Sequence, residues 1–156
     1  MSYDLSQKSQ KGFTLVEIIL VIAILAILGG VVIMAINPSR QFVVARDAER
    51  RSEVFAIVNA LHQYARDHES SFPEDITTTE LEICRTASQS CEGKQNLSSL
   101  TDNEAYLVTV PVDPVCEQEA SDCEESATGY VLSITDTGRI RVAAIHAELE
   151  EIVVTK

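Results

Sequence analysis

The sequence predicts an α+β protein in which one long N-terminal helix packs against a small antiparallel β-sheet. Residues 13–36 are almost all apolar, and apolar residues at helical spacing continue from there to about residue 69. Near the carboxyl end, residues 129–135 and 139–145 alternate apolar and polar side chains on either side of Asp136-Thr137-Gly138. Such alternation around a glycine-containing turn is typical of a β-hairpin. The helix is therefore expected first and the sheet last.

The first half of the helix, residues 13–36, has the composition of a membrane span. It would be roughly 36 Å long as a helix, enough to cross a hydrocarbon core of about 30 Å. Glu17 is its single charge, and a carboxylate in the middle of a bilayer costs about 2.5–3.5 kcal/mol, with less near the edge. Glu17 therefore needs a partner or a task. A secretory signal peptide is a poorer interpretation, because the run is too long and no A-x-A-like site follows it.

The second half, residues 37–69, predicts an amphipathic helix that is half-buried against the rest of the chain. Gly29, Gly30 and Pro38 are expected to interrupt the helix, because glycine weakens it and proline removes a hydrogen bond. Asp47 and Arg51 have the spacing of an i,i+4 ion pair. The buried face is predicted from apolar residues at helical spacing: Val54, Ile57, Val58, Leu61 and Ala65.

Residues 70–156 predict a globular head that needs the helix to complete its core, since the segment is small on its own. Its first part, residues 75–96, is rich in Thr, Ser and Glu and predicts a loop. Residues 97–107 are a candidate short helix, and residues 149–154 are a candidate strand after the hairpin. The head is therefore expected to end in a small antiparallel sheet.

The four cysteines, Cys84, Cys91, Cys116 and Cys123, form two pairs with the same C-x6-C spacing. Zinc is disfavoured, because its cysteine pairs are normally closer together and no histidine stands beside either pair. Two small disulfide loops are the preferred interpretation, and they imply an oxidising compartment. In the loop-entropy model each would stabilise the fold by about 2.5 kcal/mol. The spacing alone leaves the connectivity open.

The chain is acidic, with a formal net charge of −12. Direct nucleic-acid binding is disfavoured, because an acidic surface repels phosphate. Acidic residues crowd the loop of the second cysteine pair, and oxygen ligands at this density could bind calcium weakly, although exposed carboxylates are more often just solvated. No other cofactor is predicted, and no enzymatic motif is present, so we expect no enzyme. The candidate calcium ligands are Asp113, Glu117, Glu119 and Asp122.

The residues Lys11-Gly12-Phe13-Thr14-Leu15-Val16-Glu17, followed by the apolar run, resemble the prepilin cleavage motif of type IV pilins and type II secretion pseudopilins. The resemblance implies a pilin-like fold in which residues 1–12 are a leader. It also implies that a membrane aspartic peptidase, the prepilin peptidase, cuts between Gly12 and Phe13 and N-methylates Phe13. Glu17 matches the glutamate that partners the terminus of a neighbouring subunit in this family.

Electrostatics supports the role that the resemblance gives to Glu17. Cleavage creates an α-amino group, whose usual pKa of about 7.7–8.0 keeps it mostly protonated at neutral pH. In an apolar bundle of helices a lone cation and a lone carboxylate are each costly, and pairing them across two subunits removes that cost and fixes the register. The alternative is that Glu17 only reaches the lipid headgroups from an ordinary anchor.

The function implied by the resemblance is that of a structural filament subunit of a type IV pilus. A pseudopilin of a type II secretion system is the first alternative, and a monomeric membrane-anchored binding module outside the cell is the second. The expected partners are identical or homologous pilin subunits, the prepilin peptidase, the inner-membrane assembly platform and the membrane itself.

The expected location is the inner membrane, as a single-pass precursor with its head outside, and after assembly an extracellular or periplasmic filament. The charges near the span disagree with this topology. Lys8 and Lys11 precede the span, and the positive-inside rule, counted on the arginines that follow it, puts the head in the cytoplasm. The cysteine pairs and the resemblance favour the outside. The arginines are Arg40, Arg46, Arg50 and Arg51.

Overall fold

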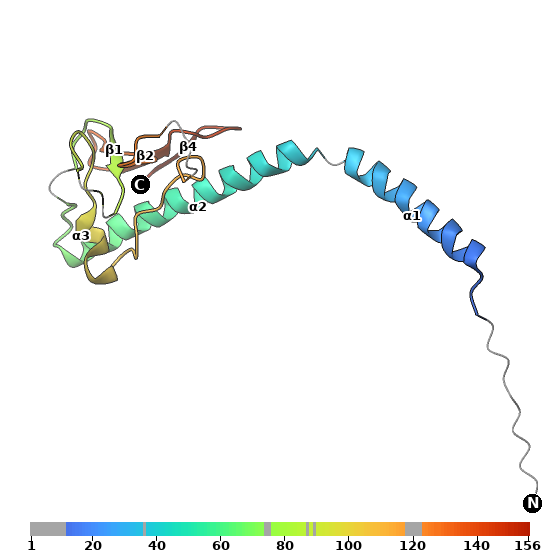
Figure 1. Ribbon diagram of the computed structural model, residues 1–156. Coiled ribbons are helices and arrows are strands. Elements are labelled where there is room, and N and C mark those ends of the chain that lie inside the picture. Colours follow the sequence, from blue (N-terminus) through green and yellow to red (C-terminus); the bar gives the residue numbers. More distant parts are fainter. Residues whose placement is uncertain (1–11, 36, 74–75, 87, 89, 118–122) are drawn as a thin grey trace, which may run out of the picture. The chain divides into compact units, whose positions relative to one another are not determined.

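The computed structural model describes residues 12–35, 37–73, 76–86, 88, 90–117 and 123–156. The chain forms two compact units, with their boundary in the sequence between Ser39 and Arg40. The first unit contains helix α1, and the second contains nearly all of helix α2 together with the sheet (Figure 1). The fold class is α+β, with the long helices before the sheet, as predicted from the sequence.

The predicted interruption of the helical region near Pro38 is confirmed. Helix α1 is Leu15–Ala35, and helix α2 is Pro38–Asp67. Proline has no backbone N–H, and the first position of a helix needs none, so Pro38 is well suited to begin α2. The interruption predicted at Gly29 and Gly30 is wrong, because both lie inside α1. An interior glycine costs about 1 kcal/mol relative to alanine, which a long helix tolerates.

Helix α2 ends close to the predicted position. The backbone N–H of Ser70 donates to the carbonyl of Ala65 at 2.7 Å, which closes the last turn. Glu69 and Ser70 have positive φ angles of 54° and 67°, and these turn the chain away from the helix before Pro73. The end of α2 is thus set by backbone geometry, and the proline only follows it.

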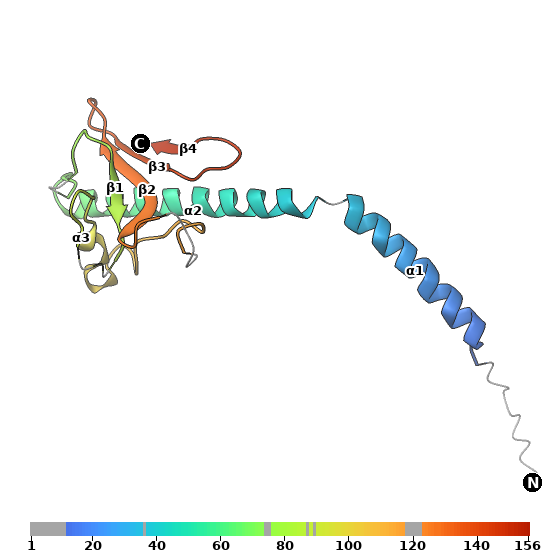
Figure 2. The ribbon, with the colours of Figure 1, turned by 45° about the horizontal axis from the view of Figure 1, so that its top comes forward.

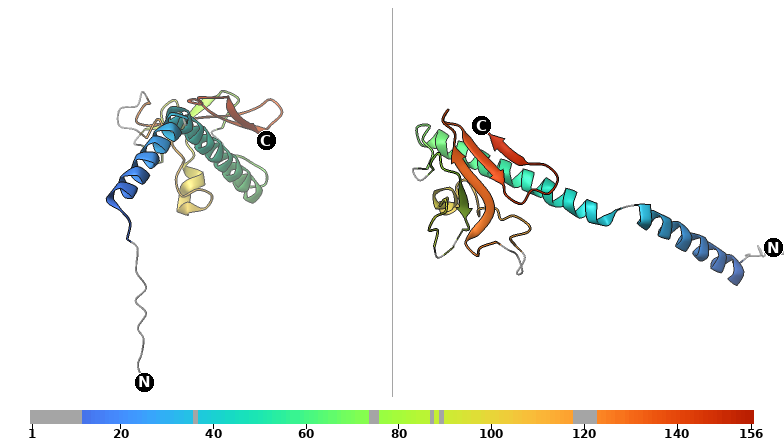
Figure 3. Two further views of the ribbon diagram at one scale, coloured as in Figure 1. Left: turned by 90° about the vertical axis from the view of Figure 1, so that its right-hand side faces the viewer. Right: turned by 90° about the horizontal axis from the view of Figure 1, so that it is seen from above.

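The core of the head lies between α2 and the sheet. All five residues predicted on the apolar face of α2 are buried. All of them except Ala65 pack in one cluster with buried residues of the strands, including Tyr130, Leu132 and Val142. Two views of the ribbon show the sheet lying along one side of α2 (Figures 1 and 3). The helix therefore supplies one side of the core, as expected for a head too small to bury a core alone.

The sheet has four antiparallel strands in the order β1-β2-β3-β4 (Figure 2). The predicted hairpin is confirmed: β2 and β3 pair from Tyr130 opposite Ala144 to Ile134 opposite Ile140. Gly138 lies in the connecting turn with φ +77°, a conformation that glycine adopts without strain. The predicted additional strand is confirmed as β4. The bounds are β1 Leu81–Cys84, β2 Ala127–Ile134, β3 Ile140–Ala144 and β4 Ile152–Thr155.

Two expectations for the head need correction. The segment predicted as a loop contains strand β1, whose pairing with β2 stabilises a run too short to be recognised by its own pattern. The short helix expected at 97–107 consists of helix α3, Ser98–Thr101, and a 3-10 turn, Asp102–Glu104. Asn103 and Glu104 have positive φ angles of 54° and 56°, so the helix cannot continue through them.

Candidate processing and assembly site

The segment before α1 is not helical, and Thr14 marks where the helix begins. Residues 12–14 have no regular structure, and α1 begins at Leu15. The Oγ1 atom of Thr14 accepts the backbone N–H of Glu17 at 3.2 Å. A threonine followed three residues later by a glutamate is the capping-box pattern, and this bond satisfies one N–H group that the first turn leaves unpaired. Thr14 thus keeps the Gly12–Phe13 peptide bond outside the helix.

The predicted cleavage point is open to an approaching enzyme. Gly12 is exposed, and Phe13 is 79% exposed. A Cβ atom added at Gly12 would meet no atom within 4 Å. The fold of the chain therefore does not require glycine at this position. Any requirement for a small residue at position 12 would come from the enzyme that binds the segment.

Glu17 lies in the first turn of α1 with its side chain exposed. Within the described part of the chain, its carboxylate has no hydrogen-bond or ion-pair partner, and only its backbone N–H is engaged, by Thr14. A negative charge in the first turn interacts favourably with the helix dipole, an effect of about 0.3–1 kcal/mol. That effect is small beside the cost of the same charge in an apolar medium, so a counter-charge is still needed there.

The surface of α1 is apolar on every side and uncovered. No residue of Leu15–Met34 is buried, and this stretch is long and apolar enough to cross a membrane. Large side chains around the whole helix are about half exposed or more, for example Val16 at 71% and Met34 at 89%. Exposing a continuous apolar surface of this size to water is strongly unfavourable, so α1 requires a bilayer or partner helices.

In contrast, the buried charges of α2, Asp47 and Arg50, are paired within the head. Arg50 is fully buried, and its guanidinium donates to both carboxylate oxygens of Asp113 at 2.8 and 3.0 Å, to Asp47 at 2.8 Å and to Glu148 at 2.9 Å. Burial disfavours the charged guanidinium, but the hydrogen bonds to the three carboxylates outweigh it and raise the pKa of Arg50. The ion pair predicted between Asp47 and Arg51 is wrong, because the carboxylate of Asp47 pairs with Arg50 instead.

An arginine cluster attaches the loop between β3 and β4 to α2. It consists of five ion-paired residues: Arg46, Asp47, Arg50, Asp113 and Glu148. Asp47 accepts the backbone N–H groups of Glu148 and Leu149 at 3.1 and 2.8 Å, and Arg46 donates twice to the Glu148 carboxylate. Burial raises the pKa of Asp47, but the N–H groups of Glu148 and Leu149 and the guanidinium of Arg50 hold it below its usual value. Hydrogen bonds from Arg46 and then Arg50 lower the pKa of Glu148 to about 2.

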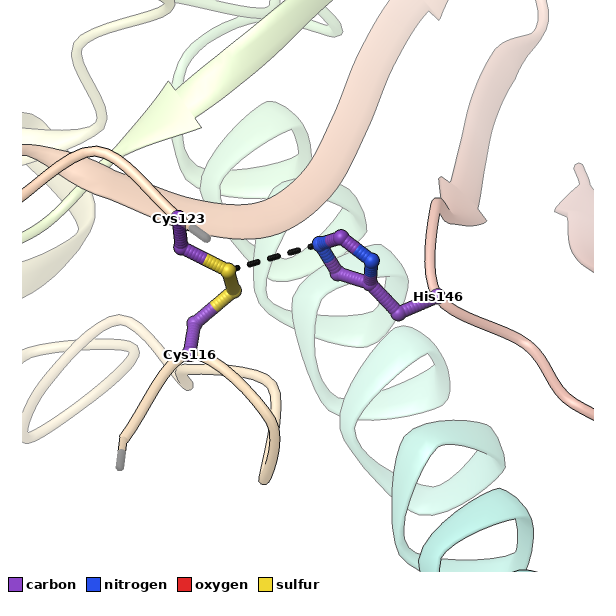
Figure 4. A group of neighbouring side chains, drawn as sticks. All are labelled: Cys116, Cys123 and His146. Carbon is purple, nitrogen blue, oxygen red and sulfur yellow. Dashed lines mark hydrogen bonds between the residues drawn. A yellow bond between two sulfur atoms is a disulfide. The ribbon is translucent and has the colours of Figure 1, made fainter. Parts of the chain in front are cut away.

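The four cysteines form two local disulfides, Cys84–Cys91 and Cys116–Cys123. The two loops are therefore closed separately, and the connectivity that the spacing left open is the local one. Beside the second disulfide lies His146, with its Nε2 atom 3.4 Å from the Sγ of Cys123 (Figure 4). The ligand atoms of Cys116, Cys123 and His146 lie within 4.8 Å of one another. With the sulfurs joined, they offer no thiolates to a metal ion.

The candidate calcium ligands are only partly described. Asp113 is fully buried, and Arg50 occupies both of its carboxylate oxygens, so it is not available to a cation in this arrangement. Glu117 is exposed. Glu119 and Asp122 lie outside the described residues. Calcium binding by this loop stays a prediction, with a ligand set that no longer includes Asp113.

The family model of the prokaryotic N-terminal methylation motif matches residues 7–33 of this chain. The matched range includes the predicted cleavage point, Glu17 and most of α1. The chain thus carries the prepilin-type signal of type IV pilins and pseudopilins, which confirms the resemblance found in the sequence. This signal and the apolar α1 fit a membrane-anchored precursor. Comparisons with curated proteins and with solved structures give no match to the chain.

The sequence did not reveal the arginine cluster or the neighbour of the second disulfide. The i,i+3 spacing of Asp47 and Arg50 is a usable signal, but Arg51 offers the equally common i,i+4 spacing. Asp113 and Glu148 are 63 and 98 residues from Arg50, and no local pattern connects them. His146 is likewise 23 residues from Cys123, and the turn after β3 brings it there.

Proposed function

We propose that this protein is a structural filament subunit of a type IV pilus, made as a membrane precursor and cut between Gly12 and Phe13. The single observation that supports this most strongly is the combination in α1 of an uncovered apolar surface with one first-turn carboxylate that has no partner among the described residues. A simple anchor needs the apolar surface but not the carboxylate. A helix that packs with copies of itself has a use for both.

In the proposed assembly, α1 exchanges the bilayer for the α1 helices of neighbouring subunits. The terminal amine released by cleavage then meets Glu17 of another subunit, and each charge removes the desolvation cost of the other. The same pairing fixes the axial register, because a shifted subunit would leave a carboxylate and an ammonium buried alone. The partners are identical or homologous pilin subunits, the prepilin peptidase and the inner-membrane assembly platform.

The head does not need this exchange to remain folded. Its core, its arginine cluster and its two disulfides all lie within residues 46–156. The subunit is thus expected to wait in the inner membrane with its head outside, then enter a filament with the head unchanged. The same logic applies to a pseudopilin of a type II secretion system, so filament location separates these two alternatives: surface filaments support a pilus, and periplasmic ones a pseudopilus.

The test of the proposal is the intact mass and N-terminal peptide of the protein from its native membrane. The expected chain begins at N-methylated Phe13 and carries two disulfides. A matched pair of variants adds specificity: Gly12→Val should leave unprocessed precursor, whereas Gly30→Ala should be processed normally. An added Cβ meets open space at both positions, so a difference reports the peptidase rather than the fold. A wild-type chain that retains residues 1–12 in the native membrane would overturn the proposal.

A further inference from the structure

The two disulfides of this chain form a natural pair for comparison. Each closes a C-x6-C loop, and in each the first cysteine is buried, with Cys84 at 2% and Cys116 at 3% exposure. In each the second cysteine, Cys91 or Cys123, is partly exposed. The neighbours of the sulfurs differ. Cys123 has the imidazole of His146 at 3.4 Å, whereas the sulfur contact described for the other pair is from Cys84 to the carbonyl of Ser90 at 3.8 Å.

We propose that His146 makes Cys123 the entry thiol for oxidation, so that the Cys116–Cys123 loop closes before the Cys84–Cys91 loop. A thiolate, not a thiol, attacks a disulfide, and a positively charged or hydrogen-bonding neighbour favours the thiolate. In the oxidised structure the Nε2 atom of His146 lies 3.4 Å from the Cys123 Sγ. In the proposed step, with both cysteines reduced, this imidazole takes the proton of Cys123 and then donates a hydrogen bond to its thiolate. Lys94 lies in the same turn as Cys91, but its ammonium pairs with Glu124, and the described contacts include no hydrogen bond to the Cys91 sulfur.

The chemistry requires a disulfide-bearing oxidant, which is a small molecule or the active site of an oxidoreductase. The Cys123 thiolate attacks one oxidant sulfur, and a mixed disulfide forms while the other oxidant sulfur leaves as a thiolate. Cys116 then loses its proton, attacks the Cys123 Sγ and displaces the second oxidant thiolate. The two cysteines are oxidised by two electrons, and the oxidant disulfide is reduced by two. Partial exposure of Cys123 favours it over buried Cys116 for the first attack.

Contacts other than the disulfide hold Cys116 and the backbone beside His146, which are two of the three parts of this group. Cys116 donates its backbone N–H to Asp113 at 2.8 Å, and its carbonyl accepts from Arg85 at 2.5 Å. Asp113 is in turn held by buried Arg50. The backbone N–H of Ile145, next to His146, donates to the carbonyl of Gly129 at 3.0 Å. The imidazole and the first sulfur are therefore positioned by β2, by the end of β3 and by the arginine cluster.

Gly129 leaves the space in which the Sγ of Cys116 and the imidazole of His146 pack close together. Its φ angle is +81°, which an L side chain rarely adopts. A Cβ atom there would lie 3.0 Å from the Sγ of Cys116, 3.2 Å from the Cδ2 of His146 and 2.7 Å from the Cβ of Asp113. Any side chain at this position would push the group apart. The close packing of sulfur and imidazole is thus a consequence of this glycine.

The experiment uses the full-length protein in detergent micelles, in two versions that each keep one loop. One version carries Cys84→Ser and Cys91→Ser, and the other carries Cys116→Ser and Cys123→Ser. Each is reduced, freed of reductant and exposed to oxidised glutathione in the presence of a chelator, so that metal binding to the free thiols does not interfere. Closure is followed by alkylation of the remaining thiols and mass spectrometry.

We expect the Cys116–Cys123 loop to close faster, and His146→Gln to slow it by about threefold or more. That factor is the gain expected for each tenfold increase in thiolate population, after allowance for the lower nucleophilicity of a stabilised thiolate. His146→Gln should leave closure of Cys84–Cys91 unchanged, and His68→Gln, at an exposed histidine in the turn after α2, should change neither rate. Equal closure rates before and after His146→Gln would overturn the proposal, as would equal slowing of both loops.

A second measurement keeps the test decisive if His146→Gln disturbs the fold. In a chain that retains only Cys123, glutathione should attach faster than in a chain that retains only Cys91. A chain that retains only Cys116 should be the slowest of these, because its sulfur is buried. Equal rates for Cys123 and Cys91 would show that His146 gives Cys123 no advantage, and the proposal would be wrong.

Discussion

Helices α1 and α2 follow one another in the sequence, yet they treat charge in opposite ways. Arg50 of α2 is fully buried, and three carboxylates of its own chain surround it. Glu17 of α1 is exposed, with no partner for its carboxylate within the described part of the chain. The buried charges of the head are therefore paired internally, whereas the carboxylate of Glu17 has no partner among the described residues. In the proposed function this difference separates the part of the chain that folds from the part that assembles.

The same comparison weakens the charge argument for a cytoplasmic head. The arginines that follow the span would favour a cytoplasmic head if they were free charges. Arg46, Arg50 and Arg51 instead form ion pairs with acidic residues of the head, and Arg50 has no exposed surface. Their place in the sequence is thus explained by the folding of the head. They give little reason to place it in the cytoplasm.

The largest effect is expected from Glu17→Val. This variant should insert into the membrane and be cut normally, but it should form no filaments, because the terminal amine of each subunit would lose its partner in the apolar bundle. Filaments can be counted by electron microscopy, and membrane insertion can be followed by fractionation. Glu17→Asp is the matched control: it keeps the charge with a shorter side chain and should retain some assembly. Normal filaments from Glu17→Val would remove the proposed pairing.

The second-largest predicted effect is on the stability of the head and concerns helix α2. Arg50→Met should lower the free energy of unfolding of the head by about 3–5 kcal/mol, because it leaves Asp47 and Asp113 buried without a counter-charge. Urea unfolding of the full chain in detergent, followed by tyrosine fluorescence, measures this change. Arg50→Met should lower the stability of the unassembled protein, whereas Glu17→Val should leave the stability of the head unchanged.

The adjacent arginine offers a control for Arg50 on the same helix. The side chain of Arg51 is 49% exposed, and its partner Glu150 is 80% exposed at 3.6 Å. Such pairs contribute about 0–1 kcal/mol, so Arg51→Met should change stability little. A similar loss for both variants would mean that the removed side-chain packing, and not the buried charge, accounts for the effect of Arg50→Met.

The sequence predicted best the features that depend on neighbouring residues. The span, the apolar face of α2 and the hairpin around Gly138 follow from spacing within a few residues, and each was found. The prepilin-type signal was recognised because its motif is continuous from Lys11 to Glu17, and the family model that matches residues 7–33 confirms it. Strand β1 was missed because four residues become a strand only through pairing with β2.

The features that sequence could not predict are those that tertiary structure selects. Asp47 can pair with either Arg50 or Arg51 on an isolated helix, and the choice is made by Asp113 and Glu148, which reach the helix only in the folded head. Asp113 illustrates the same limit. Its acidic surroundings in the sequence made it a candidate calcium ligand, whereas in the fold its carboxylate pairs with Arg50.

The smallest predicted effect is a loss of folding stability in acid that comes from one carboxylate, that of Glu148. The pKa of Glu148 in the folded head is about 2, against a usual value of 4.5, because Arg46 and Arg50 stabilise its charged form. A depressed pKa contributes stability that is fully present above the usual value and is lost as pH falls from about 4.5 to about 2. Since Glu148 is partly exposed, we expect solvent to reduce this contribution to about 1–2 kcal/mol.

Glu148→Gln tests this contribution, because it removes the charge and keeps the shape of the side chain. The variant should be less stable than the wild type near neutral pH, and the two unfolding free energies should converge as pH approaches about 2. The other carboxylates titrate in both proteins, so their effects cancel in the difference. A difference that stays constant from pH 7 to pH 2 would show that Glu148 acts through its shape alone. In that case Asp47, which holds the same loop through two backbone N–H groups, would carry the attachment to α2.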